Sequence, residues 1–239
     1  MKLQTALGLL YPTQCLTCDT MIEEHMALCG TCWRNTPFIS GLTCTGCGAK
    51  LPGEDHGTQE LCDDCLTTER PWSQGRAALH YKDNARKIVL ALKHGDRTEY
   101  AKPAGQWIAN LWPEIDKNTL VIPVPLHWLR YMRRRYNQSG LIAQYVAQNL
   151  DLPFHPDALR RHRVTESMDG KSRLDRFENV TKSIAPHPKY GQVLRGARVL
   201  LIDDVMTSGA TLTACTEACI KGGVDHVDVA VLARVAKDV

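Results

Sequence analysis

Hydrophobic residues along this 239-residue chain occur as short continuous apolar runs and as stretches with helical spacing. Residues 199–202 form a continuous run, which is typical of a strand buried on both faces of a parallel sheet. Residues 76–81 and 120–123 are further predicted strands. Amphipathic helices are predicted from residue 82 to about residue 92, over 99–111, over 138–150, and from Leu212 to the glycine pair at 222–223. This pattern predicts an α/β fold for most of the chain.

The first 70 residues contain few large apolar side chains but eight of the ten cysteines. A C-x-x-C turn directs two sulfurs at one ion, and two such turns complete a tetrahedral zinc site. We therefore expect two structural Zn²⁺ ions in a double zinc ribbon whose folding depends on the metal. The four pairs are Cys15/Cys18, Cys29/Cys32, Cys44/Cys47 and Cys62/Cys65.

The four C-x-x-C turns can be combined into two zinc sites in more than one way. The hairpin-like intervals favour consecutive pairs around each ion, and a cross-braced pairing is the alternative. Four disulfides would require an oxidising compartment, and a redox role suits four evenly distributed pairs less well than a structural role. We expect the ribbon to dock a partner or to cover one edge of the second domain.

Charge divides the chain at the same place as composition. Residues 67–74, which include Pro71, mark the predicted boundary between a zinc ribbon at 1–70 and a second domain at 71–239. The first part has four Lys/Arg against nine Asp/Glu, and the second has 25 against 17. A basic second domain suits a polyanionic ligand, either pyrophosphate or nucleic acid.

Nothing in the hydropathy predicts membrane insertion. No apolar run approaches the ~20 residues that span a bilayer. The run at residues 7–11 is too short for the core of a signal peptide, and only Lys2 precedes it. We therefore expect a cytoplasmic protein.

Residues 199–213 read VLLIDDVMTSGATLT and continue the predicted strand into two acids, a hydroxyl-rich loop and a helix start. The first N–H groups of a helix lack intrahelical partners, and the helix dipole favours an anion there. Asp203 and Asp204 repel phosphate but can accept hydrogen bonds from sugar hydroxyls. A ribose with a 5′-phosphate satisfies both halves, and an ordinary strand–turn–helix is the alternative. The predicted phosphate loop consists of Thr207, Ser208, Gly209, Ala210 and Thr211. The lysine of a Walker P-loop is absent.

A second polar stretch follows the strand at 120–123. The carboxyl ends of strands form the ligand edge of an open α/β sheet. Arginine offers bidentate hydrogen bonds to phosphate, so we expect this loop to close over pyrophosphate. A solvated basic face is one alternative. Single-stranded nucleic acid is another, because Trp128, Tyr131 and Tyr136 are interleaved with the charges. The residues concerned are Arg130, Arg133, Arg134, Arg135, Asn137 and Gln138.

The order of these motifs resembles the ComF/GntX family of phosphoribosyltransferase-like proteins. The strings are the cysteine pairs, LKHGD, IPVPLHWLR with RRRYNQ, RRHRVTESMDGKSRLDRFENV and VLLIDDVMTSGAT. The last string resembles the signature for phosphoribosyl pyrophosphate (PRPP) in type I phosphoribosyltransferases. The resemblance implies the type I fold, with about five parallel strands flanked by helices, and PRPP bound with Mg²⁺. It also implies a role in natural competence and DNA uptake, with single-stranded DNA and competence-machinery proteins as partners.

The chain departs from this family in the segments near the acceptor. Arg135 and Tyr136 stand where Gly-Phe is usual, and Met168 and Lys171 replace Gln and Leu in the next motif. In that motif Thr165, Arg176 and Asn179 match. Purine-salvage relatives have an acid at the position of Thr207, so a purine acceptor is not expected. The sequence names no catalytic residue. An active phosphoribosyltransferase and a non-enzymatic PRPP- or single-stranded-DNA-binding competence factor both stay open.

Overall fold

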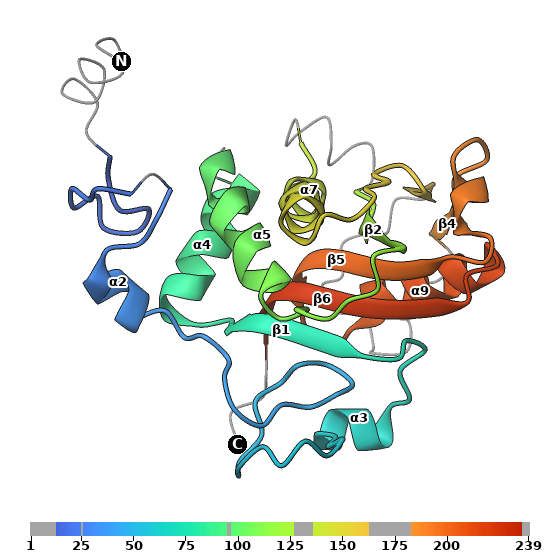
Figure 1. The fold of residues 1–239 in the computed structure, drawn as a ribbon, viewed down its shortest axis with the longest axis horizontal. Helices are drawn as coiled ribbons and strands as arrows, with labels where there is room; N and C mark the ends of the chain where they lie inside the picture. Colours follow the sequence, from blue (N-terminus) through green and yellow to red (C-terminus); the bar gives the residue numbers. More distant parts are fainter. Residues whose placement is uncertain (1–12, 25, 95–96, 127–135, 163–182, 236–239) are drawn as a thin grey trace, which may run out of the picture.

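The computed structural model describes residues 13–24, 26–94, 97–126, 136–162 and 183–235. Their centre is a four-stranded, fully parallel sheet with the order β1-β6-β5-β2 (Figure 1). The strands are β1 (Gly75–His80), β2 (Thr119–Pro123), β5 (Arg198–Met206) and β6 (His226–Arg234). A separate antiparallel ladder joins β3 (Leu159–Arg161) to β4 (Ile184–Pro186).

The two central strands are buried, as the continuous apolar run at 199–202 predicts. Register pairs Leu201 of β5 with Val229 of β6 and with Ile122 of β2. Strand β6 is not among the predicted strands, although its pairing with β5 is the longest in the sheet. The described residues contain four strands in this sheet, where the resemblance implies about five.

Helices cover both faces of the sheet, which buries the apolar side chains on each side. Helices α4 (Asp83–His94), α5 (Ala101–Ala109) and α7 (Gln138–Leu150) lie over one face, and α9 (Ala210–Lys221) covers the other (Figure 1). The four predicted helices are thus confirmed. Helix α5 begins later than expected because Thr98–Tyr100 forms the 3₁₀ turn η1. A second 3₁₀ turn, η2 (Gly191–Leu194), precedes β5.

The cysteine-rich segment carries two short helices, α2 (Gly30–Arg34) and α3 (Asp63–Thr67), and borders edge strand β1 (Figure 1). The Ile39 amide donates to the Ala78 carbonyl at 2.9 Å, and the Gly75 amide donates to the Thr45 carbonyl at 2.8 Å. An uncovered edge strand would invite pairing with other chains. The expectation that the ribbon covers one edge of the sheet is therefore confirmed.

The two halves of this segment pack on opposite faces of the sheet. Leu16 belongs to the core beneath α4, α5 and α7, whereas Cys44 and Cys47 belong to the core shared with α9. The second half therefore reaches the face from which α9 and the loop before it arise.

Candidate functional site

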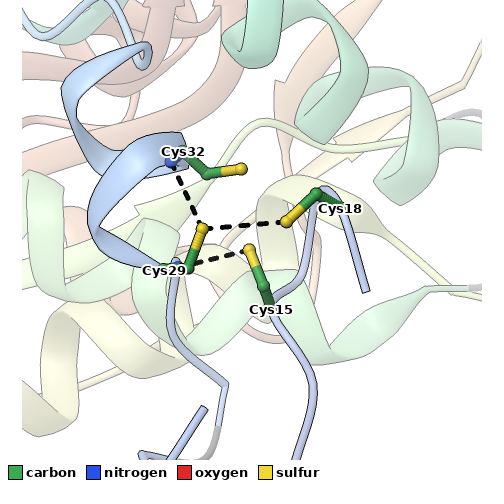
Figure 2. Close-up of side chains that lie close together, drawn as sticks. All are labelled: Cys15, Cys18, Cys29 and Cys32. Atoms are coloured by element: carbon green, nitrogen blue, oxygen red, sulfur yellow. Dashed lines mark hydrogen bonds between the residues drawn. The ribbon is translucent and has the colours of Figure 1, made fainter. Parts of the chain in front are cut away.

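Eight cysteines form two compact clusters. In the first, Cys15 and Cys18 come from a loop and meet Cys29 and Cys32 at the start of α2 (Figure 2). The sulfurs of each cluster lie within 4.8 Å of one another. The second cluster consists of Cys44, Cys47, Cys62 and Cys65.

The sulfur spacing fits zinc rather than disulfides. The Sγ atoms of Cys18 and Cys29 are 3.7 Å apart, and those of Cys47 and Cys62 are 3.6 Å apart. Tetrahedral Zn–S bonds of ~2.3 Å place sulfurs about 3.8 Å apart, whereas a disulfide bond is ~2.05 Å long. The chain thus has two Cys₄ zinc-binding sites. Each uses consecutive pairs, so the cross-braced alternative is wrong.

The two zinc sites differ in their surroundings. In the first, Cys18 is exposed, and backbone amides support the thiolates: the Cys29 amide donates to Cys15 Sγ at 3.2 Å. In the second, Cys44 and Cys47 are fully buried against the sheet domain. The second site is therefore part of the main core, while the first lies closer to solvent.

A polar cavity of about 280 Å³ lies where β2 and β5 end. The carboxyl ends of parallel strands form the usual ligand edge of such sheets. Six predicted binding residues line the cavity: Asn137, Gln138, Asp203, Asp204, Thr207 and Thr211. The structure also brings in Lys93 from the end of α4, Ser139 from α7 and Arg161 from the end of β3.

Two acids at the end of β5 form the floor of this cavity. Asp203 Oδ1 accepts hydrogen bonds from Ser139 Oγ at 2.8 Å and from the Asp204 amide at 2.9 Å. Lys93 Nζ lies 3.1 Å from Asp204 Oδ1. Burial, together with the neighbouring charge of Asp204, raises the pKa of Asp203 to about 7, against the opposing effects of Ser139 and Lys93. Asp203 therefore changes its charge near neutral pH.

The hydroxyl loop adjoins the same cavity. Gly209 is the N-cap of α9 and has a φ of 85°, a left-handed conformation that glycine adopts without strain. Helix α9 begins at Ala210, two residues before the predicted start, so Ala210 and Thr211 belong to its first turn. Their N–H groups are among the four that a helix leaves without intrahelical acceptors. The loop and the helix start together offer donors for an anion.

Other predicted residues fall outside the described part of the chain. These are the loop arginines Arg130, Arg133, Arg134 and Arg135, and the later motif residues Thr165, Met168, Lys171, Arg176 and Asn179. The assignment of the arginines to pyrophosphate stays a prediction. The described neighbour Asn137 donates from Nδ2 to the Val124 carbonyl at 3.0 Å, which joins the start of α7 to the end of β2.

Lys93 and Ser139 are not among the predicted binding residues, although the sequence around Ser139 contains a signal for its role. Ser139 stands three and seven residues before Ile142 and Val146, so it lies on the buried face of the predicted helix. A buried hydroxyl requires a polar partner, and the structure supplies Asp203. Lys93 lies at the end of its helix, and only the packing of α4 brings it to Asp204.

Comparison with known proteins assigns both halves of the chain. A double zinc ribbon domain matches residues 6–66, and a phosphoribosyl transferase domain matches residues 138–239. Among the described residues, helices are too short or too polar to cross a bilayer.

Several relatives match over most of their length. Competence protein F of Haemophilus influenzae is 28% identical, covering 86% of this chain and 96% of the relative. DNA utilization protein YhgH of Escherichia coli strain K12 is 25% identical, covering 93% and 97%. Competence protein ComFC of Bacillus subtilis is 24% identical, covering 87% and 89%. The chain thus combines a double zinc ribbon domain with a phosphoribosyl transferase domain, and it is similar over most of its length to proteins named for competence and DNA utilization.

Proposed function

We propose that this protein binds PRPP, with Mg²⁺, in the cavity at the end of β5. One observation carries the proposal: the Asp203/Asp204 pair and the hydroxyl loop at the start of α9 adjoin the same cavity. A ligand there would need hydroxyl donors at one end and an anion at the other. A 5-phosphorylated ribose has both.

Each part of PRPP has a chemically suitable partner. The 5′-phosphate would lie on the loop at 207–211, where backbone N–H groups and the hydroxyls of Thr207 and Thr211 can donate. The 2′- and 3′-hydroxyls would donate to Asp203 and Asp204. Lys93 is 3.1 Å from Asp204 and would help to balance the charge of the bound pyrophosphate.

The oxygen-rich lining also suits Mg²⁺, a hard cation that prefers carboxylate, phosphate and water oxygens. When bound, Mg²⁺ would neutralise charge on the pyrophosphate. Asp203 and Asp204 are the described residues that could hold it or its waters. The predicted pyrophosphate contacts of Arg130, Arg133, Arg134 and Arg135 belong to this proposal, as do Asn137 and Gln138 at the cavity wall.

The biological setting follows from the relatives' names. Competence protein F, competence protein ComFC and DNA utilization protein YhgH connect this architecture with competence and the use of DNA. We propose the same setting for this chain. We place it in the cytoplasm, where eight zinc-binding thiols stay reduced. We divide it into a zinc ribbon at 1–70 and a PRPP-binding domain at 71–239. The acceptor of any phosphoribosyl transfer is unidentified, and competence-machinery proteins are the proposed partners.

The test is titration calorimetry of PRPP with Mg²⁺ at pH 8, where Asp203 is ionised. The double variant Asp203→Asn, Asp204→Asn should bind more weakly, because hydrogen bonds to charged groups contribute ~1.5–3 kcal/mol each, about ten- to a hundredfold apiece. Asp157→Asn, at an exposed turn away from the cavity, is the matched control and should bind normally. Unchanged binding by the double variant would refute the ribose assignment.

A second measurement separates enzyme from binding factor. Pyrophosphate release from PRPP, with and without single-stranded DNA, should reveal transfer or hydrolysis. Replacing Arg133, Arg134 and Arg135 with alanine should weaken the binding of PRPP more than the binding of ribose 5-phosphate, because only PRPP carries the pyrophosphate. If the variant instead loses single-strand affinity and shows a shallower salt dependence, the arginines serve DNA.

A further inference from the structure

Two arginines lie between the second zinc site and the candidate phosphate loop. Arg70 follows α3 at the end of the ribbon; its Nε donates to Cys65 Sγ at 3.4 Å, and its Nη1 donates to the Ser208 carbonyl at 2.8 Å. One guanidinium thus contacts a zinc ligand and the phosphate loop. Arg70 and Ser208 are 138 residues apart in the sequence.

The second arginine, Arg234, comes from the end of β6 and is 2% exposed. Its Nη1 donates to the Thr207 carbonyl at 2.7 Å and to the Met206 carbonyl at 3.3 Å. On the ribbon side, its Nη2 lies 3.8 Å from Asp64 Oδ2. Arg234 therefore also faces both the ribbon and the loop.

Trp72 packs into the same interface. Its Nε1 donates to the Gly46 carbonyl, inside the second zinc knuckle, at 2.7 Å. A Cβ at Gly209 would lie 2.7 Å from Arg70 Nη1 and 3.3 Å from the Trp72 ring. The loop thus rests directly on Arg70 and Trp72, and a side chain at Gly209 would push them apart.

The orientation of the loop peptides follows from these bonds. In a trans peptide the C=O and the N–H point in opposite directions. The carbonyls of Met206, Thr207 and Ser208 point at the two arginines. The N–H groups of the same three peptides, which belong to residues 207, 208 and 209, therefore point away from the two arginines. These are the donors that a phosphate on the loop would use.

The negative charge of the occupied second zinc site would attract the two arginines. A Zn²⁺ ion with four thiolates carries a net charge of −2, and the thiols stay deprotonated because the metal holds them so. Cys65 and Asp64, the ribbon-side partners of the two arginines, both lie in α3 directly after the ligand Cys62, so an ion held by this cluster would fix their positions. The first zinc site has no such arginine among the described contacts, and it lies on the other face of the sheet.

We propose that Arg70 and Arg234 are positioning residues through which the second zinc site, and not the first, holds the phosphate loop in its anion-binding conformation. The identity of the anion rests on the proposed PRPP function. The bracing of the loop does not, and it can be measured without ligand.

The first experiment compares Arg70→Lys with the wild-type holoprotein. Lysine keeps the charge but lacks the planar fork of donors through which Arg70 reaches Cys65 with Nε and Ser208 with Nη1. Backbone hydrogen exchange, followed by mass spectrometry on the peptide covering 206–213, should become at least about tenfold faster with both zinc ions retained. Affinity for ribose 5-phosphate and for PRPP should fall about tenfold each, while affinity for free pyrophosphate stays unchanged. Arg86→Lys, on the exposed face of α4, is the matched control.

The second experiment compares the two zinc sites. Cys62→Ser removes a ligand of the second site without touching either arginine contact, and Cys18→Ser does the same in the first site. Zinc analysis should find one ion lost in each, but only Cys62→Ser should accelerate exchange at 206–213. Wild-type exchange in Arg70→Lys, or equal acceleration by both cysteine variants, would overturn the proposal. A wild-type protein that does not bind PRPP would refute the proposed function alone, because the exchange result still decides the bracing.

Discussion

Replacing Asp203 with asparagine should stabilise the protein at alkaline pH. The pKa of Asp203 is raised from 3.8 to about 7, first by burial and then by the charge of Asp204. Between these two pH values the folded state binds more protons than the unfolded state, so stability falls as pH rises through that window. Asparagine removes the titration but keeps Oδ1 as acceptor for Ser139 Oγ and the Asp204 amide.

The magnitude follows from the difference between the two pKa values. One pH unit corresponds to about 1.36 kcal/mol, so ionised Asp203 lowers the free energy of unfolding by up to about 4 kcal/mol above pH 7. From pH 5 to pH 8 the change is at most about 3 kcal/mol. Because the side chain keeps partial contact with solvent, we expect about 1–3 kcal/mol.

The assay is urea unfolding of wild type and Asp203→Asn at pH 5 and pH 8. At each pH the free energy of unfolding of wild type is subtracted from that of Asp203→Asn. Comparing this difference between pH 5 and pH 8 cancels the effect of groups that titrate alike in both proteins. Asp157→Asn, which replaces an exposed carboxylate, should show no such change. A stability difference that does not grow between pH 5 and pH 8 would refute the raised pKa of Asp203. A stabilised but weakly binding variant would show that the protein retains a costly charge for its ligand.

Three further predictions concern the metal, the packing and the pH dependence of binding. Elemental analysis should find two Zn²⁺ per chain, and removing them with a chelator should lower the unfolding temperature, because the ribbon has few large apolar side chains; four disulfides in protein kept reduced would contradict this. Gly105→Ala should destabilise the fold by ~1–3 kcal/mol in chemical unfolding, since its Cβ would lie 2.4 Å from Tyr145 Cβ, whereas Gly30→Ala, whose Cβ meets nothing within 4 Å, should be near neutral. Affinity for PRPP with Mg²⁺ should rise from pH 6 to pH 8, as Asp203 loses its proton near pH 7; calorimetry that shows a flat profile in this range would exclude Asp203 from the binding step.

Local sequence patterns determined the main elements and the chemistry of each motif. The apolar run at 199–202, the helical stripes and the four C-x-x-C pairs are short-range patterns, and each became the predicted strand, helix or half-site. The acids and the hydroxyl loop were readable for the same reason, because they follow one another within a single strand–turn–helix unit. Strand β6 had no such prediction, and the grouping of the cysteine pairs was open between two arrangements.

Tertiary structure alone decided which distant side chains meet at the site. Ser139 reaches Asp203 across 64 residues of sequence, and Lys93 reaches Asp204 because α4 ends above the sheet edge. Arg70 and Arg234 stand at unremarkable places in the sequence, one in the predicted linker and one at the end of a strand. Their partners in the phosphate loop are backbone carbonyls, which every residue has and which no sequence pattern distinguishes. Only the packing of the ribbon against the sheet brings Arg70 to the Ser208 carbonyl, and only the pairing of β5 with β6 brings Arg234 to the Thr207 carbonyl.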